Sequence, residues 1–224
     1  MTEQNETGYR AWRFTDRGDP ADVLSLTNMT MPAFTAAPGE EWIIVKTAFV
    51  GLNVGSIFQM TLIPQFLRAK TCTAEMDFSG EVVAVLNPSR FKMGDSVMAM
   101  LPASHSLKTG TGALAEHIAI PAKYAVEKPG NITFASAAGC LLTGMTARKQ
   151  VDEAGVRPGD RVLVNAASGG IGTMVVQMVR NIVGKKGHVV GICSGKNMEL
   201  VKELGADEVS YNTHVHTIRV VLMV

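Results

Sequence analysis

The 224-residue sequence lacks a charge excess of either sign, a long apolar run and a basic leader. Its formal net charge is +1, whereas nucleic-acid-binding domains are usually strongly basic. No run of about 18 apolar residues is present, so no membrane-spanning helix is predicted. The N-terminus, MTEQNETGYRAW, is polar and acidic where a signal peptide is basic and then apolar. We therefore expect a cytoplasmic protein that binds neither nucleic acid nor membrane.

Cysteine is also scarce. The three cysteines, Cys72, Cys140 and Cys193, are odd in number and scattered, which indicates reduced thiols and no disulfide framework. What the chain has is apolar material, since 46% of its residues are hydrophobic and only 18% are charged. This composition is typical of a globular protein with one large or two modest domains.

The first half, residues 1–135, is predicted to be a mainly-β domain. Gly and Pro interrupt it often, and the β-branched runs between them are typical of strands. These runs span residues 41–50, 80–85, 96–100 and 115–120. The polar segment Ser104-His105-Ser106 has no acid at a triad-like spacing, so we interpret it as a mobile loop and not as a nucleophile site.

From residue 136 onward, helical and strand patterns alternate as in a Rossmann βαβαβ unit. Strands are predicted at 161–165, 187–192 and 207–211, and helices at 135–151, 170–183 and 197–204. Gly205 is the expected stop of the last helix. We therefore expect residues 136–212 to form a partial dinucleotide-binding domain, followed by a divergent tail at 213–224.

A glycine-rich loop, Ala167-Ser168-Gly169-Gly170-Ile171-Gly172, lies between the first strand and first helix of this unit. Gly169 would let a pyrophosphate approach the backbone, and Gly172 would let the helix pack against the strand. The free N–H groups at the helix start would then bind the anion. Ala167 replaces the first glycine of the usual fingerprint. An ordinary strand-to-helix turn is the alternative, but the flanking strands and helix favour a dinucleotide site.

The end of the second strand indicates which dinucleotide binds. NAD sites usually carry an Asp or Glu there, for the ribose 2′-hydroxyl. This chain has Ser194 and Lys196 instead, with no carboxylate until Glu199. A hydroxyl and an ammonium suit a 2′-phosphate, and Tyr211 could close over it, so NADPH is the predicted cofactor. The alternative is that Ser194 and Lys196 only cap and solvate the next helix.

In these residues and in several further segments, the chain resembles the zinc-independent, quinone-oxidoreductase-like branch of the medium-chain dehydrogenase/reductases. The resemblance is strongest to the enoyl-reductase-type members of fungal secondary metabolism. The resemblance runs from about Tyr9 to Tyr211. The segments that carry it are Gly51-Leu52-Asn53, Glu75-Met76-Asp77-Phe78-Ser79-Gly80, Gly94-Asp95-Ser96-Val97, Gly112-Ala113-Leu114-Ala115-Glu116-His117, Thr143-Gly144-Met145-Thr146-Ala147 and Leu204-Gly205-Ala206-Asp207-Glu208-Val209.

The resemblance implies a GroES-like β-barrel domain followed by a Rossmann domain. It also implies NADPH-dependent reduction of a conjugated carbonyl such as an enone, a quinone or a polyketide-like substrate. By the same resemblance, Asn53 and Thr143 would be catalytic, and Thr146 would contact the cofactor. A turn role for Asn53 and helix back-bonding for the threonines are the structural alternatives.

Zinc is not expected. Zinc-dependent relatives need a Cys or His pair with a His-Glu motif, whereas this chain has Ala74-Glu75-Met76-Asp77 at that place. Three cysteines also cannot build a four-cysteine structural lobe. His214 and His216 would lie on one strand face, but two ligands are weak evidence for a metal.

Compared with the family it resembles, the chain is expected to be truncated within the Rossmann domain. Three parallel strands would then leave an exposed edge, and the apolar segment 218–224 would be a sticky strand. Such edges pair with other chains, which predicts a homo-oligomer formed through the C-terminal edge strand.

The sequence is also compatible with three other interpretations. One is a non-redox cyclase, isomerase or lyase that kept the fold and lost cofactor use. Another is a non-catalytic subunit that stabilises a partner reductase. The last is that the tail comes from an error in the gene model.

Overall fold

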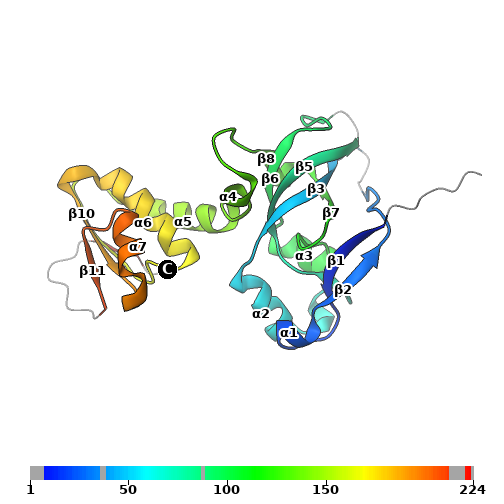
Figure 1. Ribbon diagram of the computed structural model, residues 1–224, viewed down its shortest axis with the longest axis horizontal. Helices are drawn as coiled ribbons and strands as arrows, with labels where there is room; N and C mark the ends of the chain where they lie inside the picture. Colours follow the sequence, from blue (N-terminus) through cyan, green and yellow to red (C-terminus); the bar gives the residue numbers. More distant parts are fainter. Residues whose placement is uncertain (1–7, 36–38, 87–88, 212–219, 223–224) are drawn as a thin grey trace, which may run out of the picture. The chain divides into compact units, whose positions relative to one another are not determined.

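The computed structural model describes residues 8–35, 39–86, 89–211 and 220–222. Internal contacts divide the chain into two compact units, Met1–Leu141 and Leu142–Val224 (Figure 1). The expected boundary after residue 135 lies earlier in the sequence than this division. The reason is that α4 (Phe134–Ala138) packs against β3 and β5 of the first unit.

Two antiparallel sheets build the first unit. The larger has the strand order β7-β3-β5-β6-β8, and the smaller has the order β2-β1-β4. Their strands are β1 (Tyr9–Phe14), β2 (Ser25–Met29), β3 (Trp42–Gly51), β4 (Cys72–Thr73), β5 (Asp77–Leu86), β6 (Ser96–Met100), β7 (His117–Pro121) and β8 (Ala125–Glu127). The four predicted strands correspond to β3, β5, β6 and β7, whereas the smaller sheet was not predicted.

The pairing of β3 with β5 is the longest in this unit. A side-chain carbon at Gly80 would lie 2.2 Å from the carbonyl oxygen of Lys46, so only glycine allows the two backbones to approach here. Register shifts between Ile44 and Val45 and between Thr47 and Phe49 bend the pair, as β-bulges do. The side chains that close the core are fully buried, and they include Ile43, Val45, Phe78 and Val82.

Helices cover the ends of these sheets. They are α1 (Pro20–Val23), α2 (Val54–Leu62), α3 (Ala103–Thr109) and α4, with the 3₁₀ turns η1 (Gln65–Leu67) and η2 (Ala122–Tyr124). The prediction of a mobile loop at Ser104-His105-Ser106 is wrong, because these residues belong to α3. Gly110 ends that helix at φ +73°, and the ring of His105 packs edge-on against Tyr124. Tertiary packing outweighs the polar local sequence here.

The second unit is a parallel sheet with the strand order β11-β10-β9-β12. Its elements are α5 (Leu141–Glu153), β9 (Arg161–Val164), α6 (Gly170–Val183), η3 (Gly184–Lys186), β10 (His188–Ile192), η4 (Gly195–Asn197), α7 (Met198–Glu203), β11 (Glu208–Ser210) and β12 (Val220–Leu222). The predicted strands and the helix at 170–183 agree with this βαβαβ order. The single helix predicted at 135–151 is instead two helices, α4 and α5, separated at Gly139 and Cys140.

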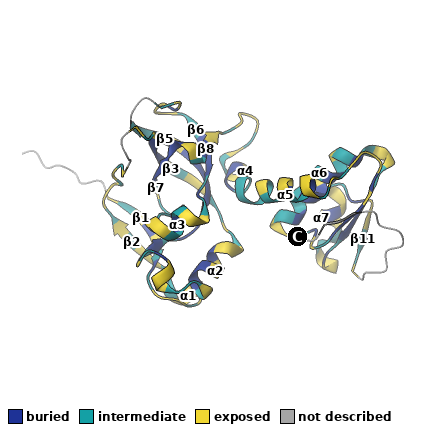
Figure 2. Ribbon diagram, turned by 180° about the vertical axis from the view of Figure 1, so that it is seen from behind, coloured by how far each residue is buried: buried dark blue, intermediate teal, exposed yellow. Residues whose placement is uncertain are grey.

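The apolar stripe of α6 explains how this unit acquires a core. Val175, Val176 and Val179 are fully buried, and they pack with Val162 and Val189 of the sheet (Figure 2). With 14 residues, α6 is the longest of the described helices. Within the described ranges, no helix is both long and apolar enough to cross a membrane.

The tail contributes a strand to the chain's own sheet. Val220–Leu222 pairs in parallel with β9, with Val221 opposite Leu163. The expectation of a three-stranded remnant is therefore wrong, because β12 adds a fourth strand beside β9. His214 and His216 lie outside the described residues.

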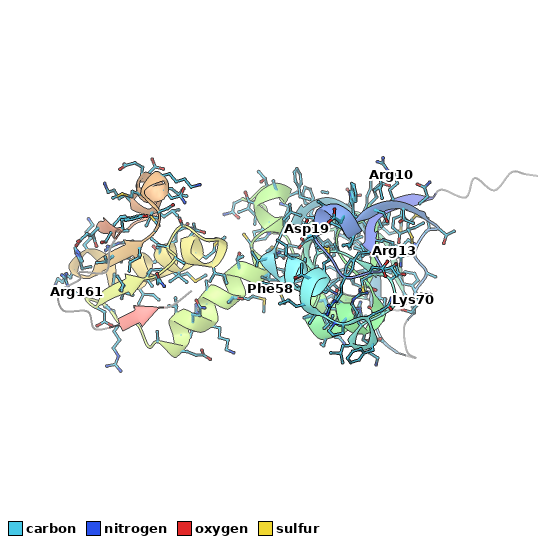
Figure 3. All side chains as sticks on the ribbon, turned by 90° about the horizontal axis from the view of Figure 1, so that it is seen from below. Arg10, Arg13, Asp19, Phe58, Lys70 and Arg161 are labelled. Atoms are coloured by element: carbon cyan, nitrogen blue, oxygen red, sulfur yellow. The ribbon has the colours of Figure 1, made fainter. Side chains whose placement is uncertain are left out.

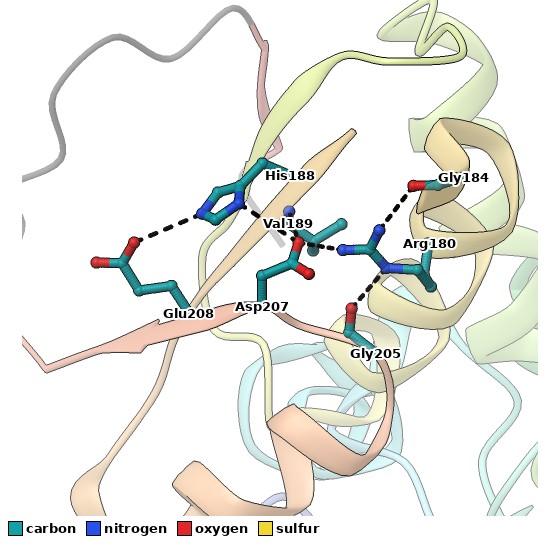
Figure 4. Close-up of polar contacts among 7 residues, drawn as sticks. All are labelled: Arg180, Gly184, His188, Val189, Gly205, Asp207 and Glu208. Atoms are coloured by element: carbon teal, nitrogen blue, oxygen red, sulfur yellow. Dashed lines mark hydrogen bonds and ion pairs between the residues drawn. The ribbon is translucent and has the colours of Figure 1, made fainter. Parts of the chain in front are cut away.

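Arg180 ties α6 to the strands and turns beside it (Figure 4). Its Nε donates to the carbonyl oxygen of Gly205 at 2.8 Å, and its Nη1 donates to that of Gly184 at 2.8 Å. Its Nη2 forms an ion pair with Asp207, whose carboxylate also accepts the backbone N–H of Val189 at 2.7 Å. This cluster holds the start of β10 against the approach to β11.

Candidate cofactor and ligand sites

The glycine loop turns sharply between β9 and α6. Ala166 has φ +50°, a left-handed conformation that non-glycine residues rarely adopt. A side-chain carbon at Gly172 would lie 2.2 Å from the carbonyl oxygen of Ala166, so the first turn of α6 rests directly on the turn before it. Ala167 is fully buried in the core, and its N–H donates to the carbonyl oxygen of Ile192 at 2.9 Å. These contacts pack Ala167 beneath the loop, between β9 and β10.

The start of α6 has the properties of an anion site. Gly169 is the residue before the helix, Gly169 and Gly170 are exposed, and Ile171 is half-buried. The first N–H groups of a helix have no partner within that helix and carry the positive end of its dipole. The first turn contains no acidic residue that would compete for these groups. The backbone here suits a phosphate.

A small hydrogen-bond network joins the loop to the end of β10. Asn197 donates from Nδ2 to the hydroxyl oxygen of Ser168 at 3.1 Å and to that of Ser194 at 3.2 Å. The structure thus brings Ser168 and Ser194 to the same amide. Asn197 was missed at the sequence level, although its position three residues after Ser194 is a usable signal, because its N–H also closes a turn onto the carbonyl of Ser194.

Lys196 follows Ser194 in η4 and is exposed. The nearest carboxylate along the chain, Glu199, pairs with Lys202 at 3.2 Å. Tyr211, just after β11, is 72% exposed, and no hydrogen bond in the described part of the chain joins it to Ser194 or Lys196. The basic and hydroxyl groups thus stand at the end of β10 as expected, while Tyr211 is not held against them.

The two threonines of α5 lie in the same unit as the glycine loop. A side-chain carbon at Gly170 would be 3.4 Å from the Cγ2 of Thr143, so that threonine borders the loop. Thr146 donates from its hydroxyl to the carbonyl oxygen of Leu142 at 2.7 Å, one turn back in the helix. This is the back-bonding alternative, and it occupies the Thr146 hydrogen in this structure.

Asn53 belongs to the first unit, where it immediately precedes α2. Its Nδ2 donates to the carbonyl oxygen of Gly51 at 3.0 Å, which is the turn role considered from the sequence. Its backbone N–H donates to Oε2 of Glu75 at 3.1 Å. Glu75 was not proposed as a site residue from the sequence, and its environment is unusual for a carboxyl group.

Glu75 lines an apolar cavity of about 630 Å³ within the first unit. The wall is made by Trp12, Pro20, Ala21, Leu24, Leu52, Asn53, Val54, Ile57, Met60, Ala74, Glu75 and Leu114. Three exposed apolar side chains of this region, Phe58, Leu62 and Phe66, do not line this cavity. Figure 3 labels Phe58 on α2. Phe58 borders a smaller cavity instead.

Metal ligands do not gather in the parts of the two units that the structure describes. Among the described residues, no group of three or more His, Cys, Asp or Glu side chains could hold a metal ion. At the place where zinc-dependent relatives carry their motif, Glu75 bonds to Asn53 and Ser56.

Residues 39–130 match the family model of the alcohol dehydrogenase GroES-like domain. The chain is 30% identical over 228 residues to a medium chain reductase of an Acremonium species, covering 92% of this chain and 61% of the relative. It is 32% identical over 211 residues to a chloroplastic quinone-oxidoreductase of Triphysaria versicolor, covering 89% and 60%. The chain thus spans about 60% of the length of these relatives.

Solved structures agree on the fold. The quinone oxidoreductase of Coxiella burnetii superposes with a TM-score of 0.76 at 24% identity, covering 91% of this chain and 62% of that one. Mycobacterial Rv1454c, solved as a complex with NADPH, gives a TM-score of 0.75 at 26% identity, covering 92% and 59%. The first unit is therefore a GroES-like barrel domain, and the second is part of a Rossmann domain.

Proposed function

We propose that this chain, which is similar in sequence and fold to quinone-oxidoreductase-like medium-chain reductases, is an NADPH-dependent reductase of conjugated carbonyl compounds. The observation that carries the proposal is the packing of Gly172 on Ala166, which holds the start of α6 open beside exposed Gly169 and Gly170. A Rossmann pyrophosphate site needs this arrangement.

The preference for NADPH over NADH rests on the end of β10. Ser194 offers a hydroxyl and Lys196 an exposed ammonium, both of which suit a 2′-phosphate. An Asp or Glu at this place would repel the phosphate, and the nearest one, Glu199, pairs with Lys202. Rv1454c, which shares the fold, was solved with NADPH bound, and this supports the same choice of cofactor.

The bound dinucleotide would supply a hydride to the carbon of a conjugated carbonyl. The residues of the second unit would hold its phosphates, with Thr143 beside the loop at Gly170. The relatives named as medium chain, quinone and trans-enoyl reductases support an enone, quinone or polyketide-like substrate. Asn53 would contribute by fixing the backbone at the wall of the apolar cavity.

The direct test is NADPH consumption with simple enones and quinones, followed by absorbance. The proposal predicts substrate-dependent oxidation that is faster with NADPH than with NADH. Binding of NADPH without turnover would instead favour a non-catalytic subunit. A folded protein that does not bind NADPH would favour the non-redox cyclase, isomerase or lyase.

We further propose that the chain forms a homo-oligomer through β12. This strand lies at one edge of the sheet order β11-β10-β9-β12. An edge strand presents backbone N–H and C=O groups that can pair with a second copy. Such pairing does not require the proposed redox chemistry.

A further inference from the structure

Glu75 has a backbone conformation that calls for an explanation. Its φ is +64°, and only one other non-glycine residue of the described part, Ala166, has a positive φ. A backbone hydrogen bond stabilises this conformation, because the carbonyl oxygen of Glu75 accepts the N–H of Ala113 at 2.8 Å. Left-handed backbone at a large side chain is strained and tends to occur at functional sites. At Glu75 the strain places a carboxyl group at the wall of an apolar cavity.

The carboxyl group has two different oxygens. Oε2 accepts the hydroxyl of Ser56 at 2.8 Å and the backbone N–H of Asn53 at 3.1 Å. Both of these bonds fall on Oε2, and the side chain of Asn53 also acts on the carboxyl group as a hydrogen-bond donor. Glu75 is only 6% exposed, and this burial raises the pKa of its carboxyl group, although the bonds from Ser56 and Asn53 act in the opposite direction. Because Oε2 already accepts two hydrogens, the proton of the neutral acid belongs on Oε1.

The other residues that line the cavity are mostly apolar, so Glu75 is the polar group that a bound molecule would meet. Apart from Asn53 and Glu75, every residue that lines it is apolar except for the indole N–H of Trp12. The Asn53 amide donates to the carbonyl oxygen of Gly51. No other titratable side chain lines the cavity, and the groups that face the carboxyl group, Ser56 of α2 and Asn53 just before it, are uncharged.

We propose that this cavity binds a neutral apolar molecule with a carbonyl group, and that Glu75, in its protonated form, donates a hydrogen bond from Oε1 to the carbonyl oxygen of that ligand. An uncharged acid in an apolar site can donate where a carboxylate can only accept. A ligand carboxylate would be rejected, because its charge would be buried without a cationic partner. The choice of a conjugated carbonyl rests on the proposed function, whereas binding in the cavity requires no cofactor.

The probe is 2,3-dimethyl-1,4-naphthoquinone, whose substituted ring carbons prevent addition of cysteine thiols. Its carbonyl-free counterpart is 2,3-dimethylnaphthalene. Binding to the full chain is followed by calorimetry and by the fluorescence of Trp12, which lines the cavity. The protein is expected to bind the quinone roughly three- to tenfold more tightly than the hydrocarbon at a pH where Glu75 is neutral. The preference should vanish as the pH rises and Glu75 ionises.

Two variants and a control distinguish the hydrogen bond between Glu75 and the quinone from the fit of the ring in the cavity. Glu75→Leu should lose the preference for the quinone while still binding the hydrocarbon. Glu75→Gln keeps one oxygen for Ser56 and Asn53 and offers an N–H₂ to the cavity, so it should retain the preference and make it independent of pH. Glu81→Gln removes an exposed carboxylate that does not line the cavity, and it should behave as the parent protein.

Equal binding of the two probes by the parent protein would overturn the proposal. So would an unchanged quinone preference in Glu75→Leu, or the same loss of binding with pH in Glu75→Gln. If Glu75→Leu does not fold, the pH dependence of quinone binding by Glu75→Gln still tests the proposal. NADPH titration distinguishes this inference from the proposed function: quinone binding without NADPH binding would refute only the reductase, and the reverse result would refute only the role of Glu75.

Discussion

A side-chain carbon on Gly172 would lie 2.2 Å from the carbonyl oxygen of Ala166, closer than any real contact of this kind. The atom it would meet belongs to the backbone, so no side chain can turn aside to relieve the clash. The same placement would bring it to 2.9 Å from the Cα of Ala167. The glycine is therefore a requirement of how α6 joins β9, and the open helix start depends on it.

Gly172→Ala is expected to destabilise the protein by about 3 kcal/mol and to abolish dinucleotide binding, because α6 must move away from the loop. Chemical denaturation measures the first effect and calorimetric titration the second. Gly170→Ala is the matched control, since its new carbon would be 3.4 Å from Thr143 Cγ2, an ordinary contact. Equal stability of both variants would contradict the account of the loop.

Replacing Lys196 by Ala should weaken NADPH binding about tenfold, which corresponds to about 1.4 kcal/mol, and should leave NADH binding unchanged. The reason is that only NADPH carries the 2′-phosphate. Lys202→Ala is the control, because Lys202 is a lysine of the next helix that pairs with Glu199. A loss of affinity for both dinucleotides, or for neither, would exclude Lys196 as the 2′-phosphate ligand.

Arg180→Met should destabilise the second unit by about 2–3 kcal/mol. The substitution leaves the carbonyls of Gly205 and Gly184 without this donor and removes the cation beside Asp207. Arg148→Met, which removes an exposed pair with Asp152 on α5, should change stability by no more than about 0.5 kcal/mol. Denaturation curves of the two variants test the difference, and similar values would show that the Arg180 cluster contributes little.

The pH dependence of the free energy of unfolding should reveal the raised pKa of Glu75. Its folded pKa is raised by burial, so the folded state holds the proton to higher pH than the unfolded state does. Stability therefore falls as the pH rises from about 4.3, the ordinary glutamate pKa, and levels off above the folded pKa. Glu75→Gln should lack this decrease, so its stability relative to the parent should grow over that window.

Glu116 provides a control of the opposite sign for this measurement. The side chain and the backbone N–H of Arg10 both donate to Glu116 and lower its pKa. Stability contributed by that carboxylate is present above its unfolded pKa and is lost as the pH falls through the folded one. Glu116→Gln should therefore differ from the parent in the opposite direction to Glu75→Gln. A parallel response would contradict the assignment of Glu75.

Sedimentation of the parent protein at micromolar concentration is expected to give a dimer or larger oligomer, because β12 is an edge strand. A Val221→Pro variant should shift the distribution toward monomer by disturbing the backbone pairing of β12. Its thermal unfolding is the accompanying control, since β12 also pairs with β9. A monomeric parent protein would exclude the proposed edge pairing.

Much of the second unit could be predicted because its signals are local. The period of Ile171, Val175 and Val179 defines α6, and the β-branched run at 161–164 defines β9. The start of α3 could not be predicted in this way. Ser104, His105 and Ser106 are polar, and their helix depends on tertiary contacts such as that between His105 and Tyr124.

The same contrast holds for the sites. The glycine loop and Ser194 can be identified from their spacing along the chain, because each follows a predicted strand. Glu75 could not be found by spacing, because its environment comes from Asn53 and Ser56 about twenty residues away and from a cavity wall gathered from several elements. Only the folded chain shows that this carboxyl group is buried.

The most direct test of dinucleotide binding at the glycine loop is a calorimetric titration of the full chain with NADP⁺, repeated with NAD⁺ and with the Gly172→Ala variant. We expect saturable binding of NADP⁺, weaker binding of NAD⁺, and no binding to the variant. Absence of any heat of binding to the folded parent protein at millimolar NADP⁺ would contradict this expectation.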